Sequence, residues 1–202
     1  MLHSPKLLSA IRAEVTDVVA SCDSNSESSV ECAARLTASC PLLVALYHEV
    51  LRLVTSSISV RNVAVDVPIG GKILRKDGRV IIPYRQTLFD QEVFGGDAKE
   101  FNVDRFLGNK SLAGNPSYRP FGGGTTYCPG RMLAKAEVIT AVAVAVARFD
   151  MELVTPSKAH GQGPKLGKSF PRVEMKKPCL GIMGPVDGDD VVVRIRAPVS
   201  VL

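Results

Sequence analysis

Residues 121–130 read FGGGTTYCPG, and this stretch decides how the rest of the chain is interpreted. Glycines at positions 122, 123 and 124 permit positive φ and a close approach of the backbone to a bulky neighbour. Cys128 precedes Pro129, which suits the first position of a helix because the missing N–H would be unpaired there. The pattern predicts that Cys128 caps the helix that runs on through Ala147, whose dipole and free N–H groups stabilise a thiolate.

The residues around the cysteine indicate a site that holds a sulfur anion against a bulky partner. Gly130 offers a further position of close approach, in addition to the glycines before the cysteine. An isolated cysteine is more often a small buried apolar residue, and this alternative stays open on the loop alone.

Helical patterns precede this loop. Ser4-Pro5 opens a helix in which apolar residues recur at helical spacing to Val18, with Ser4 as cap. The polar stretch Ser21–Ser29 predicts a surface loop, and a weaker helix resumes over Val30–Thr37. Cys40-Pro41 begins a second strong helix, whose apolar stripe runs over Leu43–Val54.

The other segments predict short strands and irregular chain. Runs rich in Val and Ile over 55–82 indicate a small sheet, with Asp77-Gly78 as a hairpin signal. Residues 88–120 predict a long irregular stretch held by aromatic residues, and such stretches are often functional. Residues 151–202 predict strands and turns that end in a strand at Val191–Ile195. The fold class expected is mainly α with small β-sheets (α+β).

Composition excludes several classes of protein. The chain has 202 residues, which suits one domain or two small ones at about 100–200 residues each. The net charge of +5 is too weak and dispersed to indicate nucleic-acid binding. The longest near-apolar run, Val138–Ala147, is about half of what a bilayer span needs. We therefore expect no nucleic-acid partner, and neither a membrane anchor nor a signal peptide in this sequence.

Other cofactor and metal motifs fail. The five cysteines form no C-x-x-C pair, which argues against a disulfide framework and a zinc knuckle; they are Cys22, Cys32, Cys40, Cys128 and Cys179. A P-loop would need glycine at position 66 and Ser or Thr at position 73, where Asp66 and Ile73 stand. The three histidines are too dispersed for a metal centre; they are His3, His48 and His160.

Three motifs in order resemble one family. Phe121-x-x-Gly124-x-x-x-Cys128-x-Gly130-x-x-x-Ala134 resembles the haem-binding signature of the cytochrome P-450 monooxygenases. Glu49-Val-Leu-Arg52 resembles the family's Glu-x-x-Arg on helix K, and the segment 101–107 (FNVDRFL) resembles its Phe-x-Pro-Glu-Arg-Phe segment. A lone Glu-x-x-Arg is weak, since such helix pairs are usually solvated. The three together are specific.

The resemblance implies roles for named residues. Cys128 matches the proximal ligand of the haem iron, and its thiolate would push electron density onto the metal. The other positions matched to the haem site are Phe121, Gly122, Gly124, Gly130, Ala134 and Arg61, of which Arg61 would pair with a propionate. Glu49, Arg52 and Arg105 match a buried structural network. An exposed strand arginine is the alternative for Arg61.

The chain also departs from the family pattern. Thr126 stands where many members have an Arg or His that contacts a propionate, so that contact would be absent or reduced to a hydroxyl. Val103 and Asp104 replace Pro and Glu. The loop is more similar to sterol 7α-hydroxylases, prostacyclin synthases and fungal enzymes than to xenobiotic-metabolising members.

The family's oxygen-activating helix I motif has no match in the sequence, nor has the N-terminal anchor. Residues 1–202 therefore resemble the C-terminal part of the P-450 fold, from helix J to the last strand. No catalytic residue is expected beyond the haem site, and we expect the isolated chain to be inactive as a monooxygenase.

The resemblance implies a function and partners. An intact relative would carry haem b and take electrons from NADPH through an NADPH-cytochrome reductase at the endoplasmic reticulum membrane. It would hydroxylate a small hydrophobic substrate, lipid-like or a secondary metabolite. Arg119, Arg131 and Lys135 near the loop could face an acidic redox partner or be solvated. The alternatives are a non-catalytic haem-binding remnant or interaction fragment, and a cysteine protease that pairs Cys128 with His160.

Overall fold

Helix α1, Pro5–Ser24, begins where the sequence predicts it. The Ser4 Oγ accepts a hydrogen bond from the Leu7 N–H at 3.3 Å, and Pro5 takes the first helical position. The helix runs on to Ser24, so the predicted loop is shorter than expected. Val19 and Cys22 continue the buried stripe of the helix, which explains the extra turn. This computed structural model describes residues 1–154, 172–176, 181–187, 189 and 191–196.

The next two helices follow in quick succession. Helix α2, Ser29–Ser39, begins with a capping box in which Ser28 and Glu31 exchange side-chain and backbone hydrogen bonds. Helix α3, Pro41–Val54, starts on Pro41 as predicted. Their junction bends by 95°, so α2 and α3 pack as separate cylinders. Among the described residues no single helix is long and apolar enough to cross a membrane, and only the bent pair α2–α3 meets the length and composition required.

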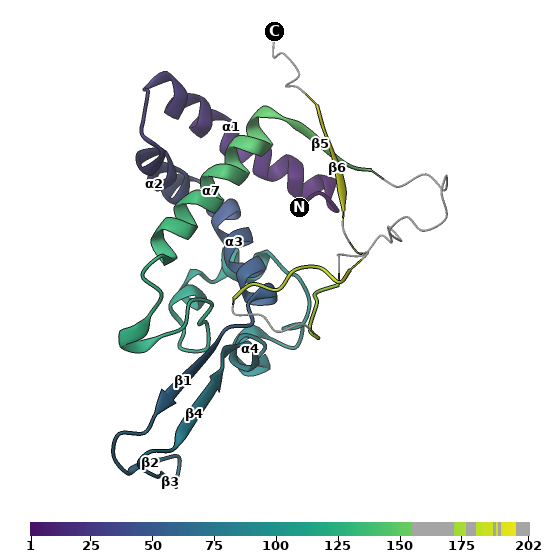
Figure 1. The fold of residues 1–202 in the computed structure, drawn as a ribbon. Coiled ribbons are helices and arrows are strands. Elements are labelled where there is room, and N and C mark those ends of the chain that lie inside the picture. The colour runs from purple at the N-terminus through teal and green to yellow at the C-terminus, as the bar shows by residue number, and fades with distance from the viewer. Residues whose placement is uncertain (155–171, 177–180, 188, 190, 197–202) are drawn as a thin grey trace.

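One core lies between the N-terminal helices and α7, Arg131–Arg148. In Figure 1, α7 runs alongside α1 and α2, although more than 90 residues separate it from α2 in sequence. Ile139, Ala143 and Val146 are fully buried, at the spacing that places them on one helix face. They pack against residues from α1, α2 and α3, which include Ile11, Val15, Leu36, Leu43 and Leu46.

A disulfide joins the end of α1 to α2, between Cys22 and Cys32. The prediction against disulfides was wrong at this pair. Its basis was the odd number of cysteines and their scattered spacing, which carry no information on how two helices fold back on each other. Both cysteines are buried in the first core, and Cys40 and Cys128 are free.

A second core lies against the other side of α3. The chain there is irregular, as predicted, with short helices α4 (Tyr84–Leu88), α5 (Gln91–Phe94), α6 (Asp104–Gly108) and the 3-10 turn η1 (Lys110–Gly114). Its buried side chains are Ala45, Leu88, Phe94, Ala98, Phe106, Leu112 and Tyr118. Because this segment has little regular secondary structure, the packing of its aromatic side chains is what mainly holds it in place.

The described strands form three antiparallel pairs. Strand β1 (Ile58–Asn62) pairs with β4 (Arg79–Pro83), and β2 (Val67–Ile69) pairs with β3 (Lys72–Leu74). Strand β5 (Asp150–Val154) pairs with β6 (Val192–Arg196), which matches the predicted terminal strand. The mainly helical α+β class is thus confirmed.

The predicted hairpin at Asp77-Gly78 is wrong. The tight turn is Gly70-Gly71, where both residues have positive φ (+57° and +75°) and connect β2 to β3. Asp77 and Gly78 instead bond to Val63 across the end of the β1–β4 ladder. An Asp-Gly pair suits any turn that needs positive φ, so the signal did not specify which strands it joins.

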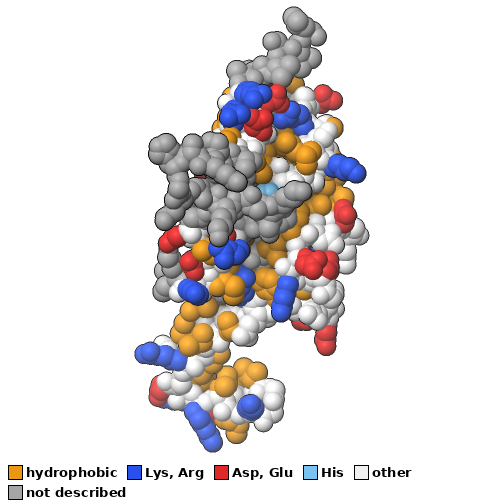
Figure 2. Space-filling view, turned by 90° about the vertical axis from the view of Figure 1, so that its right-hand side faces the viewer, with side chains coloured by type: hydrophobic (Ala, Val, Ile, Leu, Met, Phe, Trp, Pro, Cys, Tyr) orange, Lys and Arg blue, Asp and Glu red, His pale blue; other side chains and the backbone are white. Residues whose placement is uncertain are grey.

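The β1–β4 pair and the β2–β3 hairpin form an arm that projects from the helices (Figure 1). Its exposed aliphatic side chains include Ile58, Val60, Val65, Ile69, Ile73 and Ile81. Figure 2 shows hydrophobic side chains mixed with Lys and Arg at this lower end of the molecule. The arm is therefore held mainly by its attachment to the helical part, because two strands alone are marginally stable in water.

We expect the Cys22–Cys32 bond to add about 2–4 kcal/mol to the free energy of unfolding, because it restricts the unfolded chain. Urea denaturation with and without dithiothreitol measures this. The reductant should lower the midpoint of the wild-type chain and leave a Cys22→Ala/Cys32→Ala variant unchanged. The same response from both chains would show that the pair is not bonded in the folded protein.

Candidate functional site

The loop 121–130 closes on itself around Cys128. The Cys128 N–H donates to the Phe121 carbonyl at 3.2 Å, and the 3-10 turn η2, Gly124–Thr126, lies between them. The Cys128 thiol is free and half-buried. Phe121 packs against the first core and thereby fixes one end of the loop. The loop therefore presents a thiol from a backbone anchored on the helical core.

Two glycines in the loop have positive φ. Gly122 (+78°) is buried, and a Cβ there would lie 3.7 Å from the Tyr84 ring. Gly124 (+71°) is exposed, and a Cβ there would meet nothing within 4 Å. A side chain is disfavoured at both positions by the backbone conformation. Gly124 in addition leaves one face of the loop open to a large partner.

Cys128 does not cap α7, which corrects the sequence-based expectation. The N-cap is Gly130, whose carbonyl accepts the Ala134 N–H at 2.9 Å. Pro129 and Gly130 form a turn in which the Arg131 N–H reaches the Cys128 carbonyl at 3.4 Å. Proline at the second position of a turn is as favourable as proline at the first helical position, so the sequence did not separate the two. A Cβ on Gly130 would lie 3.9 Å from the Cys128 Sγ.

Arg61 lies beside the cysteine loop. It stands on β1 with its guanidinium exposed, and it donates to the Thr126 hydroxyl. The predicted propionate-binding residue and the departure at Thr126 thus meet in a single contact. The cation at this edge of the loop comes from β1.

Glu49 and Arg52 form a buried ion pair on α3. Both side chains are fully buried, and the Arg52 Nε and Nη2 each lie 2.8 Å from a Glu49 oxygen. The remaining Arg52 N–H groups donate to the backbone carbonyls of Leu88, Ala98 and Glu100. All five N–H groups of this guanidinium are therefore satisfied, as a buried charge requires.

Arg105 approaches the same carboxylate from α6. Its Nε lies 3.5 Å from Glu49, and its Nη1 lies 3.0 Å from an Asp97 oxygen. Asp97 also accepts from the Asn102 side chain at 3.0 Å, and these bonds lower the pKa of its carboxyl group. The structure thus brings Glu49, Arg52 and Arg105 together. Asp97 was not singled out from the sequence, because nothing local to it indicates a partner eight residues away.

Two further residues, one next to the loop and one in the second core, were also missed. Tyr84 is buried next to Gly122, and its hydroxyl lies 2.9 Å from the Ser59 Oγ. His48 is half-buried, and its Nδ1 lies 2.9 Å from the Tyr118 hydroxyl. Burial, with a smaller contribution from Lys135, lowers the pKa of His48 to about 4, so the ring is neutral at pH 7.

A family profile described as Cytochrome P450 matches residues 1–173 of this chain. The chain belongs to the cytochrome P450 family. The predicted family is confirmed, and the P450 match spans α1 to the segment after β5, including the cysteine loop and the Glu49–Arg52 pair.

Curated P450 relatives match most of this chain but a minor part of their own length. Cytochrome P450 monooxygenase poxD of Penicillium oxalicum is 34% identical over 162 residues, which are 76% of this chain and 32% of the relative. Cytochrome P450 monooxygenase calL of Penicillium decumbens is 32% identical over 77% of this chain and 30% of the relative. Cholesterol 7-alpha-monooxygenase of Cricetulus griseus is 30% identical over 73% of this chain and 30% of the relative. The chain thus spans about a third of these relatives.

The residues of this P450 chain fit the haem that the family implies. A thiolate is a soft ligand suited to iron, and Cys128 is the free half-buried thiol of the loop. Gly124 and Gly130 leave space on the loop that a side chain would otherwise reduce. Arg61 supplies a cation next to the loop, which suits a carboxylate.

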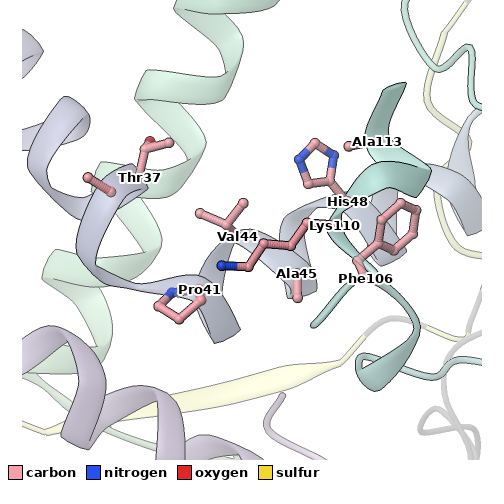
Figure 3. Close-up of a pocket in the computed structure, with 9 residues that line it drawn as sticks. Thr37, Pro41, Val44, Ala45, His48, Phe106, Lys110 and Ala113 are labelled. Atoms are coloured by element: carbon pink, nitrogen blue, oxygen red, sulfur yellow. The ribbon is translucent and has the colours of Figure 1, made fainter. Parts of the chain in front are cut away.

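A small pocket of about 140 Å³ lies between residues of α2, α3, α6 and η1 (Figure 3). His48, Phe106 and Lys110 contribute to its wall, together with Thr37, Ala38, Pro41, Val44, Ala45 and Ala113. Phe106 stacks on the His48 ring with centroids 5.4 Å apart. The neutral ring of His48 therefore belongs to an aromatic cluster of the second core.

A larger apolar cavity of about 930 Å³ lies along α3. Leu46, Val50 and Leu53 line one wall, and Met183 and Gly184 line another. The Met183 N–H donates to the Val54 carbonyl at 2.9 Å, so the end of α3 and the segment around Met183 lie side by side at this point. Residues 178–180 lie outside the described residues, as does His160 of the protease alternative.

The basic residues near the cysteine loop are partly engaged within the chain. The Arg131 guanidinium lies 4.3 Å from the centre of the Tyr127 ring and donates to the Cys128 carbonyl at 3.1 Å. The Arg119 side chain lies next to Gly123, since a Cβ at that glycine would be 3.4 Å from its Cδ. Lys135 is half-buried, which lowers its pKa. Arg131 is therefore bound to the loop, and all three residues add positive charge around it.

Replacing Arg52 with Met should lower the free energy of unfolding by about 3–5 kcal/mol, because Glu49 would remain buried without its partner. The matched control is Arg148→Met, which breaks the exposed pair with Asp23 and should cost about 1 kcal/mol or less. Urea denaturation of both variants measures the difference. Equal losses would contradict a special role for the buried pair.

Proposed function

We propose that this chain is the haem-binding part of a cytochrome P450 monooxygenase, with the Cys128 thiolate as the proximal ligand of haem b. The observation that carries the proposal is the free, half-buried thiol on a glycine-lined loop, within the region matched by the family profile. On this proposal residues 1–202 are a partial haem domain, equivalent to helix J through the last strand of the fold.

The residues that would hold haem surround the cysteine. Phe121 would pack close to the ring, and Gly122, Gly124, Gly130 and Ala134 would permit its close approach to the loop. Arg61 would bind a propionate, which suits its exposed guanidinium at the edge of the loop. Thr126 already accepts from Arg61 and would help to orient it.

When bound, haem supplies the iron that activates O2, so that one oxygen atom enters a C–H bond of the substrate. The chain's own contribution is to position the thiolate. The Cys128 N–H is fixed on the Phe121 carbonyl, and the loop is supported by the first core. Glu49, Arg52 and Arg105 would act as a structural network that keeps the preceding segment in place.

The substrate and partners follow from the family. We propose a small hydrophobic substrate, lipid-like or a secondary metabolite, which agrees with the apolar wall of the cavity along α3 and with a relative named for cholesterol. An NADPH-cytochrome reductase would supply two electrons, and the basic side chains near the cysteine loop suit an acidic surface. The full-length protein would lie at the endoplasmic reticulum membrane.

A second candidate function is haem binding without turnover. The family's oxygen-activating motif has no match within the 202 residues, which favours it for this chain alone. We expect the purified chain, supplied with haem and a reductase, to form no product from lipid-like substrates. Substrate-dependent NADPH consumption together with hydroxylated product would overturn this expectation.

Replacing Cys128 with Ala should abolish the thiolate-type Soret band in the reduced carbon-monoxide difference spectrum, because the sulfur ligand is lost. Cys40→Ala is the matched control, since Cys40 is a free cysteine buried in the first core. A thiolate-type band that survives in the Cys128 variant would contradict the assignment of the ligand.

A further inference from the structure

We propose that Tyr84 is a positioning residue that clamps the cysteine loop onto strand β1. The inference rests on the proposed function, because it concerns how the Cys128 thiolate is presented. It rests on contacts that join three segments far apart in sequence: β1, the start of α4 and the loop 121–130.

Tyr84 makes a different set of contacts from the buried aromatic residues of the cores. Its side chain is buried, with 7% of the residue exposed, yet it belongs to neither apolar cluster. The ring lies next to Gly122, since a Cβ at that glycine would be 3.7 Å from the ring Cε2 and from the hydroxyl oxygen, and the hydroxyl lies 2.9 Å from the Ser59 Oγ. Its own N–H donates to the Ser57 carbonyl at 3.2 Å. The hydroxyl end of the ring is thus hydrogen-bonded to β1 and lies next to the loop.

The support reaches Cys128 in two short steps. Gly122 follows Phe121, and the Phe121 carbonyl is the acceptor of the Cys128 N–H. A shift of Gly122 away from the ring would therefore move the carbonyl that fixes the cysteine backbone. Gly122 has a positive φ of +78°, so its backbone conformation disfavours a side chain between the loop and the ring.

The same strand holds the other part of the loop. Arg61 stands two residues after Ser59, so both side chains project from one face of β1. Arg61 donates to Thr126, while Ser59 fixes Tyr84 behind Gly122. The turn before Cys128 is therefore held by one face of β1 at two points. Arg61 binds it directly at Thr126, and Ser59 acts at Gly122 through Tyr84.

The clamp can be tested without haem, by hydrogen exchange at the Cys128 amide of the full 202-residue chain. Tyr84→Phe keeps the ring but removes the hydroxyl, and Ser59→Ala removes its partner. Each should speed exchange of this amide about fivefold, the equivalent of one neutral hydrogen bond. The double variant should be no faster than either single variant, because both remove the same bond.

The matched control is Tyr47→Phe. Tyr47 is equally buried, at 7% exposed, and its hydroxyl has no hydrogen-bond partner in the described part of the chain. This variant should exchange like the wild type at Cys128. Wild-type exchange in both Tyr84→Phe and Ser59→Ala would overturn the clamp, and so would faster exchange in the Tyr47 control of the same size.

A second measurement connects the clamp to the thiolate. In haem-loaded chain, Tyr84→Phe should lower the fraction of the thiolate-type Soret band in the carbon-monoxide spectrum, and Tyr47→Phe should not. If the wild type itself lacks this band, the proposed function fails, and the exchange experiment still decides the clamp. If the band is present and unchanged in Tyr84→Phe, the positioning role is wrong.

Discussion

The Arg52 guanidinium is the group on which the rest of the structure depends. It is fully buried, and it donates to one carboxylate and to three backbone carbonyls of the irregular segment. That segment has little regular hydrogen bonding of its own. Arg52 therefore satisfies backbone carbonyls there that would otherwise be buried without a donor. Phe89 and Phe94 lie at 5.6 and 5.3 Å from the same group and exclude water from it. The second core packs around this guanidinium, and Arg105 approaches the carboxylate that Arg52 binds.

Local signals in the sequence predict the helices well. Ser4-Pro5 and Cys40-Pro41 specify two helix starts, because capping and the fixed φ of proline are properties of neighbouring residues. The same signals fail where two structures use one pattern. Pro129 suits a turn as well as a helix start, and Asp77-Gly78 suits several turns. The Cys22–Cys32 disulfide was beyond prediction, since it depends on how α1 and α2 pack.

The site divides in the same way. Spacing in the motifs singled out Cys128, Glu49, Arg52 and Arg105, and the profile match places them in a P450 chain. Asp97 and Tyr84 carry no such spacing. They are identified by tertiary contacts, of Asp97 with Arg105 and of Tyr84 with Ser59 next to Gly122, which short motifs do not indicate. Sequence patterns thus identified the groups with distinctive chemistry, and the structure adds those that hold them in place.

The identity of the groups that accept hydrogen bonds from Arg52 determines which sequence changes the fold can tolerate. Three of its bonds end on main-chain oxygens at residues 88, 98 and 100, which every amino acid supplies. Substitutions at exposed positions between them, such as Gln91 and Glu92, therefore leave these hydrogen bonds intact. The number of residues between these carbonyls is not, because inserting or deleting one would move an acceptor away from a charge that has no access to water. The hydrogen bonds of Arg52 therefore constrain the length of this segment more than the identity of its exposed side chains.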